Sequence, residues 1–135
     1  MATKLRDYIL AHTGKPFRWD GNNCLSFASG AIEACGGAGL PRDWYVGASD
    51  RREAVRAYKA GLKRYGYASI IDAINDRYER IFTLHPDDGL LCARKTDDLM
   101  GNAFGVSFRN GCVFLTDAGA KWSDIEAGDR FWRIS

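Results

Sequence analysis

A cysteine at the junction between a turn-rich loop and an apolar segment constrains the fold of this chain more than any other feature. In the segment Cys24–Cys35, apolar residues recur with the i, i+3, i+4 and i+7 spacing of an amphipathic helix. The loop before it is rich in Gly and Asn, so Asn22 or Asn23 is expected to be the N-cap, and Gly36-Gly37 is expected to end the helix. Cys24 is therefore predicted to lie in the first turn of a helix.

Two roles are open to Cys24. The unpaired backbone N–H groups of a first helical turn carry partial positive charge, which lowers the pKa of a thiol and favours the thiolate. Several cysteine hydrolases place their nucleophile in this way. The alternative is that Cys24 is a small buried hydrophobic side chain, which is the usual role of cysteine on an apolar helix face.

Three more helices are predicted, over residues 3–12, from Asp50 to about Tyr65, and over residues 68–80. Asp50 and Glu53 have the spacing of a capping box. The helix that they open carries a row of basic residues on its outer side, namely Arg52, Arg56, Lys59 and Lys63. This row is either a patch for an acidic partner or a solvated helix face, and the second interpretation is favoured.

The pattern changes to strands beyond residue 88, with strands predicted at 90–93, 103–108, 112–115 and 130–134. Asn110-Gly111 indicates a type I′ hairpin turn, and the stretch through Trp122 is expected to be a loop. Helices followed by an antiparallel sheet indicate an α+β fold. We predict a single domain over residues 1–135, with a helical part at about 1–82 and a sheet part at about 88–135.

Composition restricts the possible classes of function. A chain of 135 residues with a net charge of +2 is long enough for one core and has little attraction to nucleic acid or membranes. No apolar run is long enough for a membrane span, and no signal peptide is evident, so synthesis in the cytoplasm is expected. The four cysteines lack metal-ligand spacing, so free thiols are expected and neither a metal nor another cofactor is.

The residues that lead into Cys24 resemble a known motif. Gly14-Lys15-Pro16-Phe17-Arg18-Trp19, followed by Asn23-Cys24, is similar to the entry motif of the NlpC family of papain-like cysteine peptidases, which cleave bacterial cell-wall peptides. A closer resemblance is to a small branch encoded by phage and prophage tail genes, whose last strand reads like Trp132-Arg133-Ile134. The resemblance covers residues 14–36 and, more weakly, 88–117 and 130–134. It implies a papain-like NlpC-type core with Cys24 as the nucleophile.

The chain departs from this family at two chemical positions. Ala103 occupies the place of the catalytic histidine, and alanine cannot accept the proton of a thiol. Phe17 occupies the place of a family tyrosine whose hydroxyl assists the active site, and loss of such a donor costs about 3 kcal/mol of transition-state stabilisation. The third polar member of the catalytic triad would fall near Thr116 or Asp117.

A substitute base would have to be one of the two histidines, His12 or His85. His12 is expected at the end of the first helix, near the returning loop, and His85 in the loop before the sheet. Asp20 or Asp88 would be available to polarise such a histidine, although aspartates in turns usually cap local N–H groups. For each histidine the favoured interpretation is a surface loop residue.

The resemblance together with these departures indicates a structural component of a phage or prophage tail tip or baseplate, built on an inactive NlpC-like scaffold. Its expected partners are other tail proteins and peptidoglycan, with no nucleic acid and no membrane span, and its expected location is the host cytoplasm and then the virion tail. Trp44 and Tyr45, in a Gly- and Pro-rich loop, are candidate interface residues. The alternative is an active thiol endopeptidase or amidase that opens peptidoglycan during phage entry.

Overall fold

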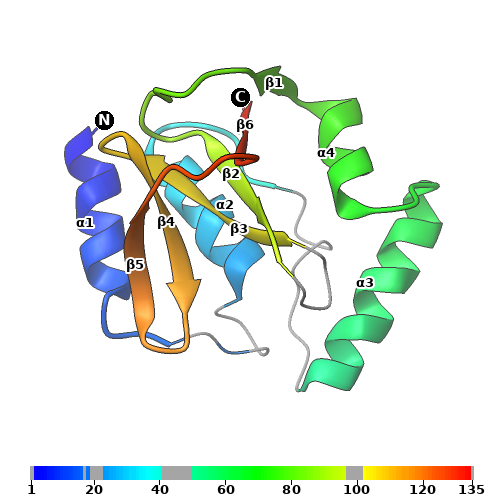
Figure 1. Ribbon diagram of the computed structural model, residues 1–135. Coiled ribbons are helices and arrows are strands. Elements are labelled where there is room, and N and C mark those ends of the chain that lie inside the picture. The colour runs from blue at the N-terminus through cyan, green and yellow to red at the C-terminus, as the bar shows by residue number, and fades with distance from the viewer. Residues whose placement is uncertain (1, 17, 19–22, 41–49, 97–101, 135) are drawn as a thin grey trace.

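The computed structural model describes residues 2–16, 18, 23–40, 50–96 and 102–134, and it has an α+β architecture (Figure 1). The helices are α1 (Ala2–His12), α2 (Cys24–Ala34), α3 (Arg51–Tyr65) and α4 (Ile70–Arg77). The strands are β1 (Glu79–Ile81), β2 (Leu91–Lys95), β3 (Asn102–Phe108), β4 (Gly111–Thr116), β5 (Gly119–Asp124) and β6 (Arg130–Arg133). The predicted order of helices before a sheet is confirmed.

The strands form a six-stranded sheet in the order β1-β6-β2-β3-β4-β5, and neighbouring strands are antiparallel. Strands β2 to β5 follow one another in space as they do along the chain. The chain then crosses from β5 at one edge to β6, which pairs with β2 through Leu91 and Trp132. α2 lies against one face of the sheet, with α1 on one side of it and α4 and α3 on the other (Figure 1). Ile70 and Ile74 of α4 share one buried apolar cluster with Leu25 of α2.

Apolar side chains bury both faces of the sheet. On the α2 face, cluster 1 joins Leu25 to Phe104 and Trp132, and cluster 2 joins Phe27 to Val113. The other face carries cluster 3, which contains Leu90, Cys92, Cys112, Phe114 and Phe131. Ile125, from the connection between β5 and β6, packs against cluster 3. This crossing connection therefore helps to cover the face of the sheet that α2 leaves free.

Two predicted boundaries are corrected by strand pairing. The fourth helix ends at Arg77 rather than near residue 80, because residues 79–81 pair with β6 as strand β1. Residues 119–124, predicted as a loop, form strand β5. Lys121 and Trp122 are both exposed although they are consecutive, so this strand lacks the alternation by which strands are recognised in a sequence.

The predicted hairpin between β3 and β4 is confirmed, but its turn lies one residue earlier than expected. Arg109 and Asn110 have positive φ values of 50° and 58°, as a type I′ turn requires, and Gly111 already pairs with Phe108. A Cβ atom at Gly111 would lie 2.3 Å from the ring of Trp122. The glycine is therefore explained by the passage of the Trp122 ring over the strand and not by the turn.

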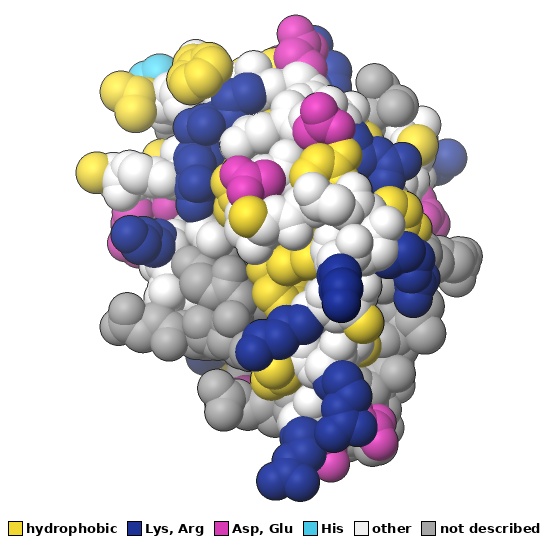
Figure 2. Space-filling model, turned by 90° about the vertical axis from the view of Figure 1, so that its right-hand side faces the viewer, with side chains coloured by type: hydrophobic (Ala, Val, Ile, Leu, Met, Phe, Trp, Pro, Cys, Tyr) yellow, Lys and Arg dark blue, Asp and Glu magenta, His cyan; other side chains and the backbone are white. Residues whose placement is uncertain are grey.

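The basic row of α3 is exposed at all four positions, Arg52, Arg56, Lys59 and Lys63, as a solvated helix face would be. Figure 2 shows this side of the molecule, where Lys and Arg side chains are spread among hydrophobic ones and a few acidic ones. Asp50 caps the helix, since its Oδ1 accepts a bond of 2.9 Å from the N–H of Glu53. Among the described helices, none is both long and apolar enough to cross a bilayer.

Candidate functional site

Cys24 is the first residue of α2, as predicted. Asn23 is the N-cap, and a reciprocal capping box fixes the helix start: the Ser26 N–H donates to Asn23 Oδ1 at 2.9 Å, and the Asn23 N–H donates to Ser26 Oγ at 3.0 Å. The Cys24 side chain is half-buried and packs against cluster 1. The thiol therefore lies at the positive end of the α2 dipole, with one side against the core.

His12, the first candidate base, is held by its own helix. Its Nδ1 lies 2.9 Å from the Tyr8 carbonyl oxygen, and because a carbonyl only accepts, Nδ1 donates this hydrogen bond. The imidazole stacks at 4.3 Å on the Tyr8 ring and meets the Phe27 ring edge-on at 5.4 Å. Phe27 lies one turn after Cys24 in α2, so these contacts place His12 about one helical turn from Cys24, with its described hydrogen bond directed to Tyr8.

His85, the second candidate base, lies at the far end of β3. Its Nδ1 is 3.4 Å from Oδ1 of Asn110, in the turn that follows β3. Cys24 packs on the cluster that contains Phe104, near the beginning of the same strand. The four residue steps from Phe104 to Phe108 extend for about 13 Å, so the contacts of His85 lie toward the opposite end of the sheet.

Ala103, the position that the resemblance gives to the missing histidine, lies on the opposite face of the sheet from α2. Ala103 packs against cluster 3, whereas its neighbour Phe104 packs against cluster 1 beside Leu25. Successive side chains of a strand point to opposite faces, so Asn102 shares the face of Phe104. The described residue of the β3 start that faces the helix side is thus an amide, which is no more able than alanine to accept the thiol proton.

The remaining predicted polar residues serve local turns. Thr116 Oγ1 donates to the Gly119 carbonyl at 2.8 Å and accepts from the Ala118 N–H at 3.1 Å, which closes the β4–β5 turn around Asp117. Asp88 accepts a bond of 2.8 Å from the Arg109 N–H. Neither residue contacts an imidazole through these bonds. Four other predicted positions, Phe17, Asp20, Trp44 and Tyr45, lie outside the described residues.

The sequence did not predict a cavity of about 630 Å³ at the end of the sheet, between the start of α4 and the β5–β6 connection. Ser69 and Ile71 line it from α4, Lys95 and Asn102 from the ends of β2 and β3, and Arg130 from β6. Ile71 also packs against cluster 1, the cluster that Cys24 contacts. The Arg130 Nη2 donates to Asn102 Oδ1 at 2.6 Å, which fixes both side chains in the wall.

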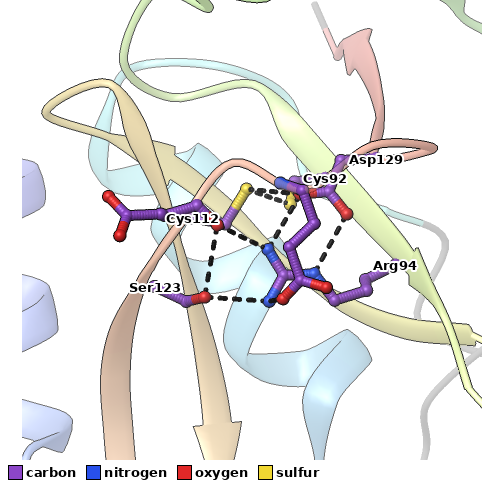
Figure 3. Close-up of polar contacts among 7 residues, drawn as sticks. Cys92, Arg94, Cys112, Ser123 and Asp129 are labelled. Carbon is purple, nitrogen blue, oxygen red and sulfur yellow. Dashed lines mark hydrogen bonds and ion pairs between the residues drawn. The ribbon is translucent and has the colours of Figure 1, made fainter.

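Arg94 and Asp129 also line this cavity. Figure 3 shows the polar contacts that hold them. The Arg94 Nε donates to Asp129 Oδ1 at 3.0 Å and its Nη2 to Asp129 Oδ2 at 2.8 Å, a bidentate pair. Nη1 bonds Ser123 Oγ at 2.9 Å and pairs with Glu126 at 2.9 Å, and the guanidinium lies 4.8 Å from the centre of the Phe114 ring. The hydrogen-bonded Asp129 carboxylate raises the pKa of Arg94. The sequence gives one indication of this buried pair: Arg94 directly follows the apolar run 90–93, where a charged side chain inside a strand requires a partner.

The described residues that line the cavity can bind polar groups of a ligand. The Arg94 charge is neutralised by carboxylates, whereas Lys95 and Arg130 remain as cations beside the Asn102 amide. No cluster of three or more His, Cys, Asp or Glu residues suited to a metal ion occurs among the residues that the structure describes. The cavity can therefore receive carboxylate or amide groups of a ligand, and its described lining contains no imidazole.

Comparison with protein families matches nearly the whole chain. The family model described as a domain of unknown function, DUF6950, matches residues 1–134. No curated protein matches the chain, and no solved structure matches it.

Proposed function

From the premise that the chain belongs to the DUF6950 family, a domain of unknown function, we propose that it is a structural component of a phage or prophage tail tip or baseplate. In this proposal the chain has an NlpC-like scaffold that no longer catalyses peptide hydrolysis. Its role is to bind neighbouring tail proteins, and contact with peptidoglycan would be a consequence of its position at the tail tip.

One observation carries the loss of activity: the described hydrogen bond of each histidine goes to a residue other than Cys24. His12 is bonded to Tyr8 and packed on Phe27, and His85 is beside Asn110. A thiol has a reference pKa of about 8.5, so it is mostly protonated at neutral pH unless a base or a cation activates it. The helix dipole alone favours the thiolate, but it provides no group to protonate the leaving amine.

The alternative, an active thiol endopeptidase or amidase, is favoured by the position of Cys24 itself. The thiol is half-buried at the start of α2, where a hydrolase would place its nucleophile. In such an enzyme the thiolate would attack an amide carbonyl, the amine would leave with a proton from the base, and water would hydrolyse the thioester. This mechanism requires an imidazole that moves to the thiol from the contacts described above.

Thiol alkylation measured from pH 5 to 10 separates the two proposals. Cys35 is a matched control, because it is the C-cap of the same helix and is also half-buried, and burial together with Asp88 raises its pKa. For an inactive scaffold we expect Cys24 labelling to rise near the pKa of an ordinary thiol. Rapid labelling below about pH 6.5 that is lost in His12→Ala or His85→Ala would support the enzyme instead.

Two assays test the loss of peptidoglycan cleavage and the proposed place in the phage tail. Purified cell walls should show no clearing that depends on Cys24, with Cys24→Ser and Cys35→Ser compared in parallel, and Cys24-dependent clearing would overturn the inactive scaffold. The protein should co-purify with tail particles after phage production is induced in a strain that carries its gene. A free protein absent from the particles would contradict the structural role.

A further inference from the structure

We propose that Arg80, Phe82 and Leu84, which we call the β1 edge site, bind an extended segment of a partner protein through a carboxylate and two apolar side chains. The proposal rests on the proposed function in one respect, because both require a partner protein. The β1 edge site adds the chemistry of the segment that this partner presents. Each of its three residues is described by the structure, and none belongs to the Cys24 site.

Arg80 is prepared to bind an anion in the plane of its guanidinium. The guanidinium carbon lies 4.6 Å from the centre of the Phe82 ring and 5.4 Å from the centre of the Trp132 ring. Both aromatic rings therefore contact the guanidinium and orient it. Its Nε is buried and has no hydrogen-bond partner among the described residues. A buried donor without a partner destabilises the folded state, and an in-plane carboxylate would remove this penalty.

The local charge also favours an anion. Burial, and then the charge of Arg130, lower the pKa of Arg80, so the two arginines lie close enough to repel each other. The nearby carboxylates are already paired: Glu79 with Arg133, and Asp129 with Arg94. Arg130 bonds the neutral Asn102 amide instead of a carboxylate. Within the described part of the chain the positive charge of Arg80 and Arg130 therefore lacks a counterion.

Apolar side chains continue this site along the chain. Phe82 is 82% exposed and Leu84 is 75% exposed, the two largest exposures among the large hydrophobic side chains described. A cavity of about 430 Å³ lies beside them and is also lined by Arg80 and Asp129. Contiguous exposed apolar groups next to an unpaired cation are typical of a surface that a partner covers.

The position of β1 in the sheet indicates how the partner would bind. β1 is the edge strand and pairs only with β6 in the described sheet, so its other side is available for a further strand. A segment added there would place alternate side chains on one face. Arg80 lies in β1, and Phe82 and Leu84 follow the end of β1 at the same spacing of two, so the matching segment carries one acidic and two apolar residues at alternate positions.

Peptide binding tests this assignment. The probes are the acetylated, fluorescein-labelled peptides Thr-Glu-Thr-Leu-Thr-Leu-Thr and its reverse, Thr-Leu-Thr-Leu-Thr-Glu-Thr, which cover the parallel and antiparallel directions. Their controls have Gln in place of Glu. We expect fluorescence anisotropy to show at least about tenfold tighter binding of one Glu peptide than of its Gln control, because a charge-assisted hydrogen bond is lost in the control. The Arg80 Nε–H resonance should shift with the Glu peptide alone.

Variants localise the interaction. Arg80→Gln should abolish the preference for Glu, and Phe82→Ser, at an exposed position, should weaken both peptides at least about fivefold. Arg133→Gln is the matched control, because it removes an exposed arginine of the adjacent strand and should leave binding unchanged. Circular dichroism verifies that each variant is folded.

Several results would overturn the proposal. They are equal affinity for the Glu and Gln peptides, unchanged binding by Arg80→Gln, or no measurable binding of either direction. A concentration-dependent dimer of the free protein that Phe82→Ser dissociates would also overturn it, since a second copy would then be the occupant. The peptide assay does not use tail particles, so its failure is distinct from failure of the proposed function.

Discussion

The Sγ atoms of Cys92 on β2 and Cys112 on β4 lie 2.8 Å apart on the inner side of the β5–β6 connection, across the strand β3 that separates them (Figure 3). Gly105 of β3 pairs with Cys92 and has no side chain between the two thiols. Both cysteines are fully buried, in cluster 3. This pair, which the sequence did not link, determines the first prediction, and the second concerns Gly105 beside it.

The first prediction is a loss of stability at alkaline pH. Burial and the hydrogen bond to Cys112 raise the pKa of Cys92 above its ordinary value of 9.0. A raised folded-state pKa means that the unfolded chain loses its proton first, so stability is unaffected below about pH 9 and falls above it. We expect a loss of about 1.4 kcal/mol for each pH unit above 9 from this thiol, measured by urea unfolding between pH 7 and 10.5.

Cys92→Ala should show a smaller alkaline loss than the wild type, although it is less stable at pH 7. Tyr78 and Cys35, whose pKa values burial also raises, continue to titrate in this variant and provide the remaining slope. Equal slopes for the wild type and Cys92→Ala would show that Cys92 does not titrate on unfolding.

The second prediction concerns Gly105. A Cβ atom there would lie 2.2 Å from the Val113 carbonyl oxygen, which is backbone and cannot swing aside. Gly105→Ala should therefore decrease the free energy of unfolding by about 2–3 kcal/mol, because strands β3 and β4 must separate locally. Gly14→Ala is the control, since a Cβ atom at Gly14 meets nothing within 4 Å and should change stability by less than about 0.5 kcal/mol. Similar small changes for both variants in chemical denaturation would contradict the packing argument.

The third prediction compares the contributions to stability of the two carboxylates, Asp129 and Glu126, that pair with the Arg94 guanidinium. The Asp129 side chain is 1% exposed, whereas that of Glu126 is 61% exposed, and both pair with Arg94. Asp129→Asn should lower the unfolding free energy by about 2–3 kcal/mol, because it leaves a largely buried cation without its bidentate partner. Glu126→Gln should lower it by less than about 0.5 kcal/mol, because water screens an exposed pair. Thermal unfolding at pH 7 compares them, and equal losses would refute the assignment.

The fourth prediction tests the start of α2. Asn23→Ala removes the side-chain acceptor for the Ser26 N–H and should destabilise the protein by about 1 kcal/mol. Asn23→Asp keeps the acceptor and adds a negative charge at the helix N-terminus, so stability should be close to that of the wild type. Cys24 alkylation serves as a local readout, and it should accelerate in the Ala variant as the first turn frays. If Ala and Asp have the same effect, the capping box does not stabilise the start of the helix.

Sequence reasoning worked where a local rule and the final structure agree. Asn23 and Asp50 begin helices because their side chains satisfy backbone N–H groups two or three residues ahead, a purely local effect. Strands β1 and β5 were not predicted, because pairing with other strands and not a local pattern defines them. Sequence reasoning also assigned the hairpin turn to Asn110-Gly111, because the need of Gly111 to accommodate the Trp122 ring is not visible in a local pattern.

The candidate site shows the same division. The sequence by itself determined that Cys24 begins a helix, that histidines occur only at positions 12 and 85, and that strands follow helices. Tertiary structure alone decided where the imidazoles lie, which face Ala103 occupies, and that Arg94 meets Asp129 from 35 residues away. Local patterns are set by hydrogen bonds and side-chain periodicity within a few residues. Which distant side chains meet depends on strand order and register, and these follow from packing the whole chain at once.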